Sequence, residues 1–368
     1  MSFMKRVFHI ISHLDVGGAE RVAVNIAKSV SPGFEYHVVE VVRAHSPFTR
    51  TLLQELREAG IAYHRFIVPD IKFHYLFERL AAWLFPFWFI FVFLKYRPAV
   101  MHCHSEIPEL ATYRFFHCFP WLAKRCKVVR TIHNTQLWTG MEGVGRRVER
   151  WLQSRNANVA ISLSVQESYQ RAYGERPPII YNGVEECVER KDYPAIVSGK
   201  VNVLFAGRLE EQKGIVHLID IVTSLKGDSR YFFHIIGDGR LKEMVTARFA
   251  DLPNVAIHSP LYGLSAYLPS FDYLLMPSEH EGLSLLSIEA SMAGLPVIAN
   301  DCLGLKDTLP DGWPLLVHGN NKEEYAHLFS TFLPHCDAGV LAEKARRFSE
   351  EHFGLRPMQL KYEQCYGR

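Results

Sequence analysis

Short apolar runs alternate with amphipathic stretches along most of the chain. In the first half, these runs predict strands at residues 6–11, 36–42, 61–66, 99–103, 127–132, 158–161 and 178–181. In the second half, they predict strands at residues 201–206, 232–236, 255–258, 274–276, 297–299 and 315–317. Between several of the runs apolar residues recur at helical spacing, as Val22, Ile26 and Val30 do. Strands that alternate with helices predict parallel sheets covered by helices, the α/β class of fold.

The stretch from residue 272 to residue 300 has the clearest local pattern. Its first apolar run ends at Pro277, which predicts a buried strand that passes into a loop. Apolar residues then recur at helical spacing after Ser284, which is a suitable N-cap, and Gly294 followed by Pro296 is a stop signal. The pattern predicts a strand, a loop, a helix and a second strand.

Two acidic residues of this stretch are candidates for ligand binding. Glu281 lies in the predicted loop at the carboxyl end of a strand, where open α/β sheets bind their ligands. The backbone amides from Ser284 to Leu286 would be free donors at a helix N-terminus, which suits an anion. Glu289 lies on the helix, where its carboxylate can accept two hydrogen bonds from a vicinal diol such as ribose. The alternative is that both glutamates are ordinary solvated residues.

Two further strand ends carry residues suited to a phosphate. Gly17 and Gly18 lie between the first strand and a helix, where a glycine pair lets the backbone approach an anionic ligand closely. The alternative is that this glycine pair only forms a tight turn. In the second half, Arg208 and Lys213 follow a strand in a loop flanked by glycines. Two cations at a strand end would clamp a diphosphate, although exposed loop cations are common.

The composition limits the class of protein. A chain of 368 residues, 48% of them hydrophobic, is long enough for two α/β domains with cores of their own. A net charge of +2 gives no reason to expect a nucleic acid partner. The seven dispersed cysteines do not form a disulfide framework, which indicates a reducing compartment. Residues 1–5 lack the apolar segment of a signal peptide.

The absence of certain sequence motifs argues against metal-dependent and nicotinamide-dependent enzymes. The sequence has no Asp-x-Asp, which is the usual signal of a carboxylate-held metal. Cys103 and Cys118 each follow a histidine, but no Cys-x-x-Cys or second ligand pair accompanies them, so no metal site is predicted. Gly237 and Gly239 lack a third glycine at the dinucleotide spacing, which argues against a nicotinamide enzyme.

The segment from Arg79 to Lys95 is unusually apolar and aromatic. Its fifteen uncharged residues are fewer than the roughly 20 that a spanning helix needs, and Pro86 interrupts them. Two interpretations remain open and are compatible: a helix packed on the sheet, and a segment that binds an anionic membrane surface through residues 72–97. Aromatic residues flanked by basic residues such as Lys72 and Arg97 are compatible with the second.

Residues 277–299, PSEHEGLSLLSIEASMAGLPVIA, carry a family resemblance. The run resembles the Glu-x7-Glu signature of retaining glycosyltransferases with the GT-B fold, and most closely glycosyltransferase family 4. Residues 207–214, GRLEEQKG, are similar to that family's donor-phosphate motif, and residues 17–20 to its Gly-Gly-x-Glu loop. The family's Gly-Gly-x-x-Glu run after Val-Ile-Ala is replaced here by residues 302–307, CLGLKD, which puts one donor contact in doubt.

The resemblance implies a fold and a division of the chain. The GT-B fold has two Rossmann-like domains that face each other across a cleft, with a C-terminal helix packing back on the first domain. We therefore expect an acceptor-side domain at residues 1–182, a nucleotide-sugar-binding domain at residues 183–345, and a returning helix at residues 346–368.

The resemblance also implies roles for particular residues. The catalytic set would be His104, Glu281, Arg208 and Lys213. The donor-binding set would be Gly17, Gly18, Arg208, Lys213, Glu281, Gly282, Leu283, Ser284, Leu285, Leu286 and Glu289. His104 belongs to a His-x-His at a strand end and would orient the sugar, while His133 and Glu106 would lie on the acceptor side.

The implied activity is a metal-independent, retaining hexosyltransferase. It would move a sugar from a nucleotide diphosphate-sugar, its donor substrate, to a saccharide or lipid-linked saccharide, in the synthesis of a cell-surface polysaccharide, lipopolysaccharide or glycolipid. No cofactor is expected. The expected location is the cytoplasm, with peripheral binding at the inner face of the membrane if the aromatic segment faces a bilayer. Two alternatives stay open: a GT-B relative such as a nucleotide-sugar epimerase, and a non-catalytic nucleotide-sugar-binding subunit.

Overall fold

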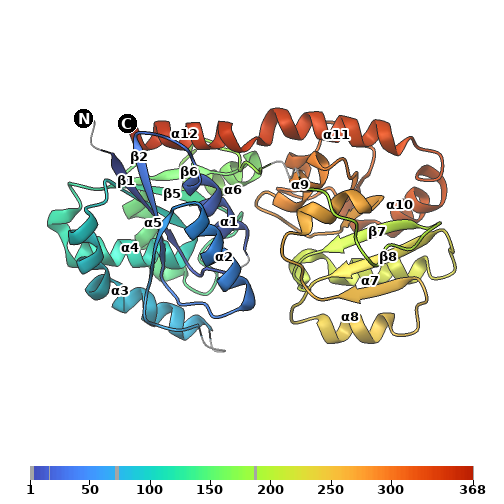
Figure 1. The fold of residues 1–368 in the computed structure, drawn as a ribbon, viewed down its shortest axis with the longest axis horizontal. Coiled ribbons are helices and arrows are strands. Elements are labelled where there is room, and N and C mark those ends of the chain that lie inside the picture. Colours follow the sequence, from blue (N-terminus) through green and yellow to red (C-terminus); the bar gives the residue numbers. More distant parts are fainter. Residues whose placement is uncertain (1–3, 16, 71–73, 186–188, 368) are drawn as a thin grey trace. The chain divides into compact units, whose positions relative to one another are not determined.

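A computed structural model describes residues 4–15, 17–70, 74–185 and 189–367, with the side chains of residues 74–76 outside the description. The chain divides into two compact units (Figure 1). Unit 1 comprises residues 1–183 and 355–368, and unit 2 comprises residues 184–354. Each unit is built on one six-stranded sheet whose neighbouring strands all pair in parallel.

The sheet of unit 1 has the strand order β3-β2-β1-β4-β5-β6. Its strands are β1 (Lys5–Ile11), β2 (Phe34–Glu40), β3 (Ala62–Arg65), β4 (Val100–His104), β5 (Lys127–Ile132) and β6 (Asn158–Ala160). Its helices are α1 (Gly18–Ala27), α2 (Pro47–Glu58), α3 (His74–Tyr96), α4 (Glu106–Cys118), α5 (Glu142–Gln153), α6 (Leu163–Tyr173) and α12 (Leu355–Gly367). The predicted strand at residues 178–181 is wrong, because there the chain makes only an isolated bridge between Ile179 and Ala160.

The aromatic segment of the sequence forms one continuous helix, α3, with Pro86 inside it. Phe85, Phe89 and Phe93 are buried in the core that α3 shares with α4 and the sheet. Phe89 lies edge-on to Phe8 of β1, with ring centroids 6.1 Å apart. The prediction that this helix packs on the sheet is therefore confirmed.

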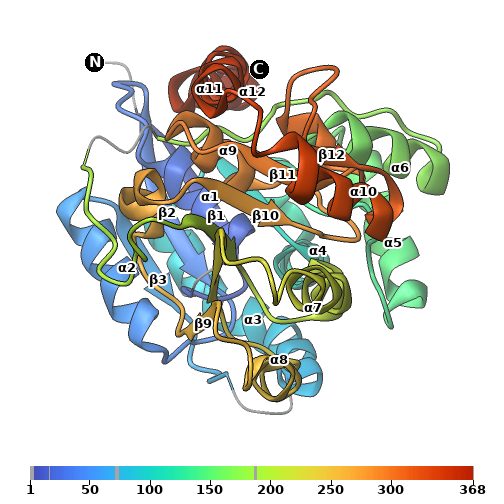
Figure 2. The same ribbon diagram turned by 90° about the vertical axis from the view of Figure 1, so that its right-hand side faces the viewer.

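The sheet of unit 2 has the order β12-β11-β10-β7-β8-β9, which repeats the topology of unit 1. Its strands are β7 (Val201–Ala206), β8 (Tyr231–Ile236), β9 (Val255–His258), β10 (Tyr273–Met276), β11 (Val297–Asn300) and β12 (Leu316–Val317). Its helices are α7 (Ile215–Ser224), α8 (Lys242–Phe249), α9 (Leu285–Met292), α10 (Lys322–His327) and α11 (Ala338–Phe353). Figure 2 shows α9 and α7 on opposite faces of this sheet, as right-handed crossovers in opposite directions require.

The end of the chain forms two helices rather than the single returning helix expected at residues 346–368. Residues 346–353 belong to α11 of unit 2, and the chain returns to unit 1 only at Leu355. Gly354, with extended backbone angles, and Pro357 in the first turn of α12 separate the two helices. α12 then packs on unit 1, where Gln359 donates a hydrogen bond to the Asn25 carbonyl oxygen at 2.8 Å. The expected return to the first domain is confirmed.

Candidate active site

The candidate donor residues of unit 2 lie beside the point where the strand order of its sheet reverses. β7 is the first strand of the unit, and its neighbours are β8 on one side and β10 on the other. The loop after β7 carries Arg208 and Lys213, and the loop after β10 carries Glu281. Open α/β sheets bind ligands at such a switch point, outside the carboxyl ends of the strands. The topology therefore brings together two loops that lie 68 residues apart in the sequence.

Lys213 and Glu281 form the central contact between these loops. The Lys213 ammonium nitrogen lies 2.6 Å from Glu281 Oε1, and both side chains are largely buried. Ser278 donates a second hydrogen bond to the same carboxylate oxygen at 2.9 Å. Burial strengthens this ion pair relative to one in water and fixes the position of both groups. The arrangement holds a cation and an acceptor of hydroxyl hydrogen bonds side by side.

Two glycines allow the loops to approach this closely. Gly214 has φ +67°, and a Cβ there would lie 1.8 Å from the Pro277 carbonyl oxygen. Gly304 has φ +77°, and a Cβ there would lie 2.1 Å from the Glu281 carbonyl oxygen. The Leu303 carbonyl also accepts a hydrogen bond from the Glu281 amide at 2.9 Å. Thus the segment 302–307, which departs from the family pattern, supports the Glu281 loop directly.

The helix that follows Glu281 begins as predicted. Ser284 caps α9 by accepting a hydrogen bond from the Ser287 amide at 3.3 Å. The remaining predicted donor residues lie on the same loop and helix: Gly282, Leu283, Leu285, Leu286 and, half-buried in the second turn of α9, Glu289. Arg208 is 63% exposed, unlike Lys213, and pairs with Glu210 at 3.3 Å. Its side chain is therefore held less firmly than that of Lys213.

The thiol of Cys302, close to this site, is buried. Burial, followed by the nearby carboxylates of Glu281 and Glu279, raises the pKa of Cys302 to about 12. A thiol with this pKa is protonated at neutral pH and is a poor nucleophile and metal ligand.

The corresponding switch point of unit 1 lies between β1 and β4. Gly17 is the N-cap of α1, and Gly18, the first residue of that helix, is exposed with open space around its Cα. Ser105, which follows β4, has φ +83°, a strained value for a residue other than glycine. Its hydroxyl lies 2.9 Å from that of Ser12, which follows β1. The two strand ends are thus joined through side chains.

Three histidines form a hydrogen-bonded chain in unit 1. His9 Nδ1 lies 3.0 Å from His104 Nε2, and His104 Nδ1 lies 3.2 Å from His133 Nε2. Burial lowers the pKa of His9 and of His133 to about 3, and that of His104 well below its usual value. A neutral imidazole has one donor and one acceptor, so all N–H groups in this chain must point in the same direction. Each tautomer therefore depends on the next.

Among the described residues, His9, His102 and His104 are the three whose side chains are placed to hold a metal ion. Both ring nitrogens of His102 already lie 2.7 Å from hydroxyls, those of Tyr366 and Thr131. Both ring nitrogens of His104 lie within hydrogen-bond distance of other histidines. A metal ion would have to break these bonds, so the cluster fits a network of neutral histidines better than a metal centre.

The acceptor-side candidates differ in their surroundings. His133 and Glu106 are half-buried, Glu106 in the first turn of α4. Glu109, one turn further along α4, is buried and accepts a hydrogen bond from Arg130 Nε at 2.8 Å. Burial raises the pKa of Glu109 to about 8. Glu109 therefore belongs to a buried hydrogen-bonded network around Arg130 in unit 1.

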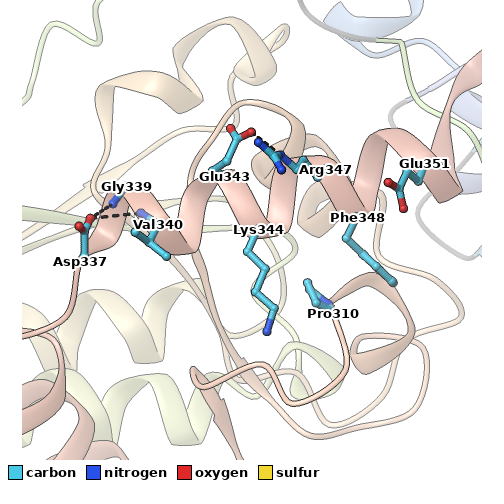
Figure 3. Close-up of a pocket in the computed structure, with 9 residues that line it drawn as sticks. All are labelled: Pro310, Asp337, Gly339, Val340, Glu343, Lys344, Arg347, Phe348 and Glu351. Atoms are coloured by element: carbon cyan, nitrogen blue, oxygen red, sulfur yellow. Dashed lines mark hydrogen bonds and ion pairs between the residues drawn. The ribbon is translucent and has the colours of Figure 1, made fainter.

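A groove along α11 contains none of the candidate residues. It has a volume of about 690 Å³, and Figure 3 shows Glu343 and Arg347 pairing along the helix beside it. Their closest atoms, Glu343 Oε1 and Arg347 Nε, are 2.6 Å apart. This surface is separate from the site at the β7 and β10 loops.

Several residues that complete these sites were not identified from the sequence. They are His9, Ser12, Ser105, Ser278 and Gly304. Ser278 and Gly304 lie in or beside the recognised motif, so their positions were visible although their contacts were not. His9 and the two serines depend on the pairing of β1 with β4, which sequence patterns alone do not reveal.

Comparison with known families gives matches in both halves of the chain. A model described as "Glycosyltransferase Family 4" matches residues 16–186. A model described as "Glycosyl transferases group 1" matches residues 200–334.

Individual relatives extend over most of the chain. An uncharacterized 41.2 kDa protein in the cps region of Klebsiella pneumoniae is 26% identical over 299 residues, which are 74% of this chain and 80% of that protein. The capsular polysaccharide biosynthesis glycosyltransferase CapH of Staphylococcus aureus is 24% identical over 317 residues, 81% of this chain and 82% of that protein. The crystal structure of Anabaena HepE in complex with UDP and glucose superposes with a TM-score of 0.78, at 18% identity, over 99% of each chain.

The two parallel six-stranded units and the structural match define the GT-B class of fold. The family matches in both units add the activity of the class. The chain is a glycosyltransferase with the GT-B fold, similar to glycosyltransferase family 4.

Proposed function

We propose that this glycosyltransferase transfers a hexose, with retention of configuration, from a nucleotide diphosphate-sugar bound at the β7 and β10 loops of unit 2. The observation that carries the proposal is the buried Lys213–Glu281 pair at the switch point of the sheet. The resemblance assigns phosphate binding to Lys213 and Arg208, and sugar hydroxyls to Glu281. Solved neighbours that contain UDP or UDP-glucose support a donor of this kind.

The leaving group determines what the site must do. When a nucleoside diphosphate departs from the anomeric carbon, negative charge develops on the phosphate oxygens. The Lys213 ammonium and the amides at the start of α9 would stabilise that charge as preorganised donors. Arg208, which is more exposed, would add a flexible second cation. Glu289 would accept hydrogen bonds from the ribose hydroxyls. Gly17 and Gly18 remain donor candidates on the resemblance alone.

We further propose that the reaction needs no metal ion and no cofactor. The cations of the site can offset the charge of a diphosphate, and the sequence contains no Asp-x-Asp. Glu281 is held by Lys213 and Ser278, which suits a hydrogen-bonding group better than a covalent nucleophile. Retention would then follow from departure and attack on the same face of the sugar, with His104 orienting it.

The acceptor we propose is a saccharide or lipid-linked saccharide in the synthesis of a cell-surface polysaccharide or glycolipid. The names of two relatives support this class of pathway: the capsular polysaccharide biosynthesis glycosyltransferase CapH of Staphylococcus aureus, and the "Putative teichuronic acid biosynthesis glycosyltransferase TuaC" of Bacillus subtilis. His133 and Glu106 are the proposed acceptor-side residues. The reaction would take place at the cytoplasmic side of the membrane.

A direct test combines nucleotide binding with product analysis. Nucleoside diphosphates and nucleotide sugars are screened for a rise in melting temperature, since a ligand that binds only the folded state stabilises it. The sugar released or transferred from the best donor is then followed by NMR in the presence of EDTA. We expect a shift with at least one nucleoside diphosphate, and an anomeric configuration identical to that of the donor.

Glu289→Ala is the informative variant, with Glu323→Ala on exposed α10 as its control. Glu289→Ala should lose the thermal shift, and Glu323→Ala should keep it. If Glu289→Ala kept a full shift, the ribose assignment would be wrong. An epimer formed without transfer to any acceptor would favour the epimerase alternative, and the absence of binding by any nucleotide would contradict the donor site itself.

A further inference from the structure

Helix α3 of unit 1 has a second apolar face that the core does not cover. Among the described residues it is the one helix long and apolar enough to cross a membrane, over Phe77–Tyr96, yet only 33% of its most apolar window is buried. A core helix would be mostly buried. The uncovered face is formed by five large side chains, which are 43–73% exposed: Leu80, Trp83, Phe87, Phe91 and Leu94.

These five residues form a continuous stripe, which we call the α3 stripe. They recur at intervals of three or four residues, so they lie on one side of the helix. Trp83 and Phe87 contact each other, with ring centroids 6.3 Å apart. The opposite side of the helix is anchored in the core by Phe85, Phe89 and Phe93. The helix cannot therefore leave the unit to span a bilayer without exposing that core, but its outer face is available to an apolar phase.

A basic groove lies next to the α3 stripe. It has a volume of about 760 Å³ and is lined by residues of α3, α4 and α5, among them Arg79, Trp83, Arg114, His117 and Arg147. Glu142 is the acidic residue in the lining. Three arginines against one glutamate leave the groove positive.

The arginines of this groove are positioned and incompletely paired. The Arg114 guanidinium lies over the Trp83 ring, 5.2 Å from its centroid, and Arg114 Nε is buried with no hydrogen-bond partner. Arg79 donates a hydrogen bond to the Gly140 carbonyl oxygen at 2.7 Å. A guanidinium has five N–H donors, so the contacts of these two groove-lining arginines do not use all of them, and the planar fork fits a phosphate.

We propose that the α3 stripe and the basic groove together bind the surface of an anionic phospholipid bilayer, with the stripe in the acyl boundary and a lipid phosphate in the groove. Trp and Phe beside arginines are the combination that suits a membrane interface. Each basic side chain adds attraction to an anionic leaflet. A second copy of the chain fits this face poorly, because a two-fold contact would place equal arginines against each other. Of residues 72–97, Lys72 lies outside the described residues.

The topology relates this surface to catalysis. Gly140, Met141 and Glu142 follow β5, so this end of the groove lies at the edge of the sheet where the parallel strands end. A lipid bound there would have its headgroup at the edge that carries His104 and His133. This relation rests on the proposed function, whereas binding to the bilayer does not.

The test uses sedimentation of the full chain with vesicles, without donor or acceptor. We expect binding to vesicles of phosphatidylcholine mixed with phosphatidylglycerol, and much weaker binding to phosphatidylcholine alone. Phe87→Ser with Phe91→Ser should weaken binding roughly tenfold or more. Arg114→Gln and Arg147→Gln should each weaken vesicle binding about fivefold, and the effect of each substitution should be smaller at high salt.

Matched controls come from the α11 groove of Figure 3, whose Val340 is 63% exposed. Val340→Ser and Arg347→Gln make the same kinds of change on a surface that we do not assign to the membrane, and both should leave vesicle binding unchanged. The melting temperature and the nucleotide-induced shift show whether each variant is folded. Loss of the nucleotide shift alone would contradict the proposed function and not the membrane surface.

Three results would overturn the proposal. Equal loss of vesicle binding in the α11 controls would show that the effect is not specific to this face. A dimer in light scattering that Phe87→Ser with Phe91→Ser dissociates would show that a second copy covers the stripe. The third result is that neither kind of vesicle is bound, while inorganic phosphate protects Arg114 from a reagent that modifies guanidinium groups. It would show that the groove binds a soluble anion.

Discussion

Two regions with the same topology, the switch points of unit 1 and unit 2, hold opposite kinds of chemistry. In unit 2 the strand ends carry a buried ion pair, Lys213 with Glu281, and in unit 1 they carry neutral histidines, among them His9 and His104. Each arrangement fits a different partner. Fixed charges suit the phosphates of a donor, and neutral hydrogen-bonding groups suit the hydroxyls of a sugar.

The difference shows how far the shared topology goes in determining function. Both sheets place loops at the carboxyl ends of their central strands, which is a property of the strand order. The side chains on those loops decide what binds. In unit 2 two glycines bring the loops close enough for the ion pair, and in unit 1 the strand register places His9 and His104 within hydrogen-bond distance.

The largest expected effect is on the charge in unit 2. Lys213→Ala should lower kcat/KM for transfer by about 10²–10³-fold, since it removes a preorganised donor to the leaving group. It should also weaken binding of the nucleoside diphosphate. His104→Ala, the matched change in unit 1, should leave nucleoside diphosphate affinity within about threefold, because no phosphate contact is assigned to it. Calorimetric titration measures both affinities.

The comparison would fail if His104→Ala weakened the binding of the nucleoside diphosphate as strongly as Lys213→Ala does. Lys213→Arg provides a second check, since it keeps the charge in a different shape and should retain part of the affinity.

The close approach of the loops in unit 2 gives the next prediction. Gly214→Ala should destabilise the protein by about 3 kcal/mol or more, for two reasons. The new Cβ would clash with the Pro277 carbonyl oxygen, and alanine disfavours the positive φ of this position. Gly263→Ala isolates the second factor, since Gly263 has φ +73° and open space around it, and should cost about 1 kcal/mol. Urea denaturation measures both. Equal losses would show that steric contact at Gly214 does not matter.

The smallest expected effect is the pH dependence of unit 1. Burial lowers the pKa of His9 to about 3 in the folded protein, whereas the unfolded chain binds a proton near pH 6.5. Stability due to neutral His9 is therefore complete above pH 6.5 and is lost as pH falls below it, by about 1.4 kcal/mol per pH unit.

The variant His9→Asn isolates this contribution from other titrating groups. Its unfolding free energy should fall less steeply than that of the unchanged protein between pH 6.5 and pH 5. His234→Asn makes the corresponding change in unit 2, where burial lowers the pKa of His234 to about 4, and should also flatten the curve. An unchanged slope in His9→Asn would show that His9 does not stay neutral in the folded state.

Much of the fold could be predicted because local sequence patterns indicate its strands and helices. Alternating apolar runs and helical stretches predicted the α/β class, and the run from Pro277 to Gly294 predicted a strand, a loop and a helix capped by Ser284. The end of the chain was less predictable. The prediction treated residues 346–368 as one helix, although Gly354 followed by Pro357 interrupts it, and the two parts belong to separate units as α11 and α12.

The sequence alone determined which loops follow the strands and which residue types those loops carry. These residues are Arg208, Lys213 and Glu281 in one half, and Gly17, Gly18 and His104 in the other. What required the folded structure is which of these side chains meet. The Lys213–Glu281 pair joins residues 68 positions apart, and the His9–His104 contact joins residues 95 positions apart. Such contacts depend on strand order and register, which long-range packing fixes, and so no local pattern can specify them.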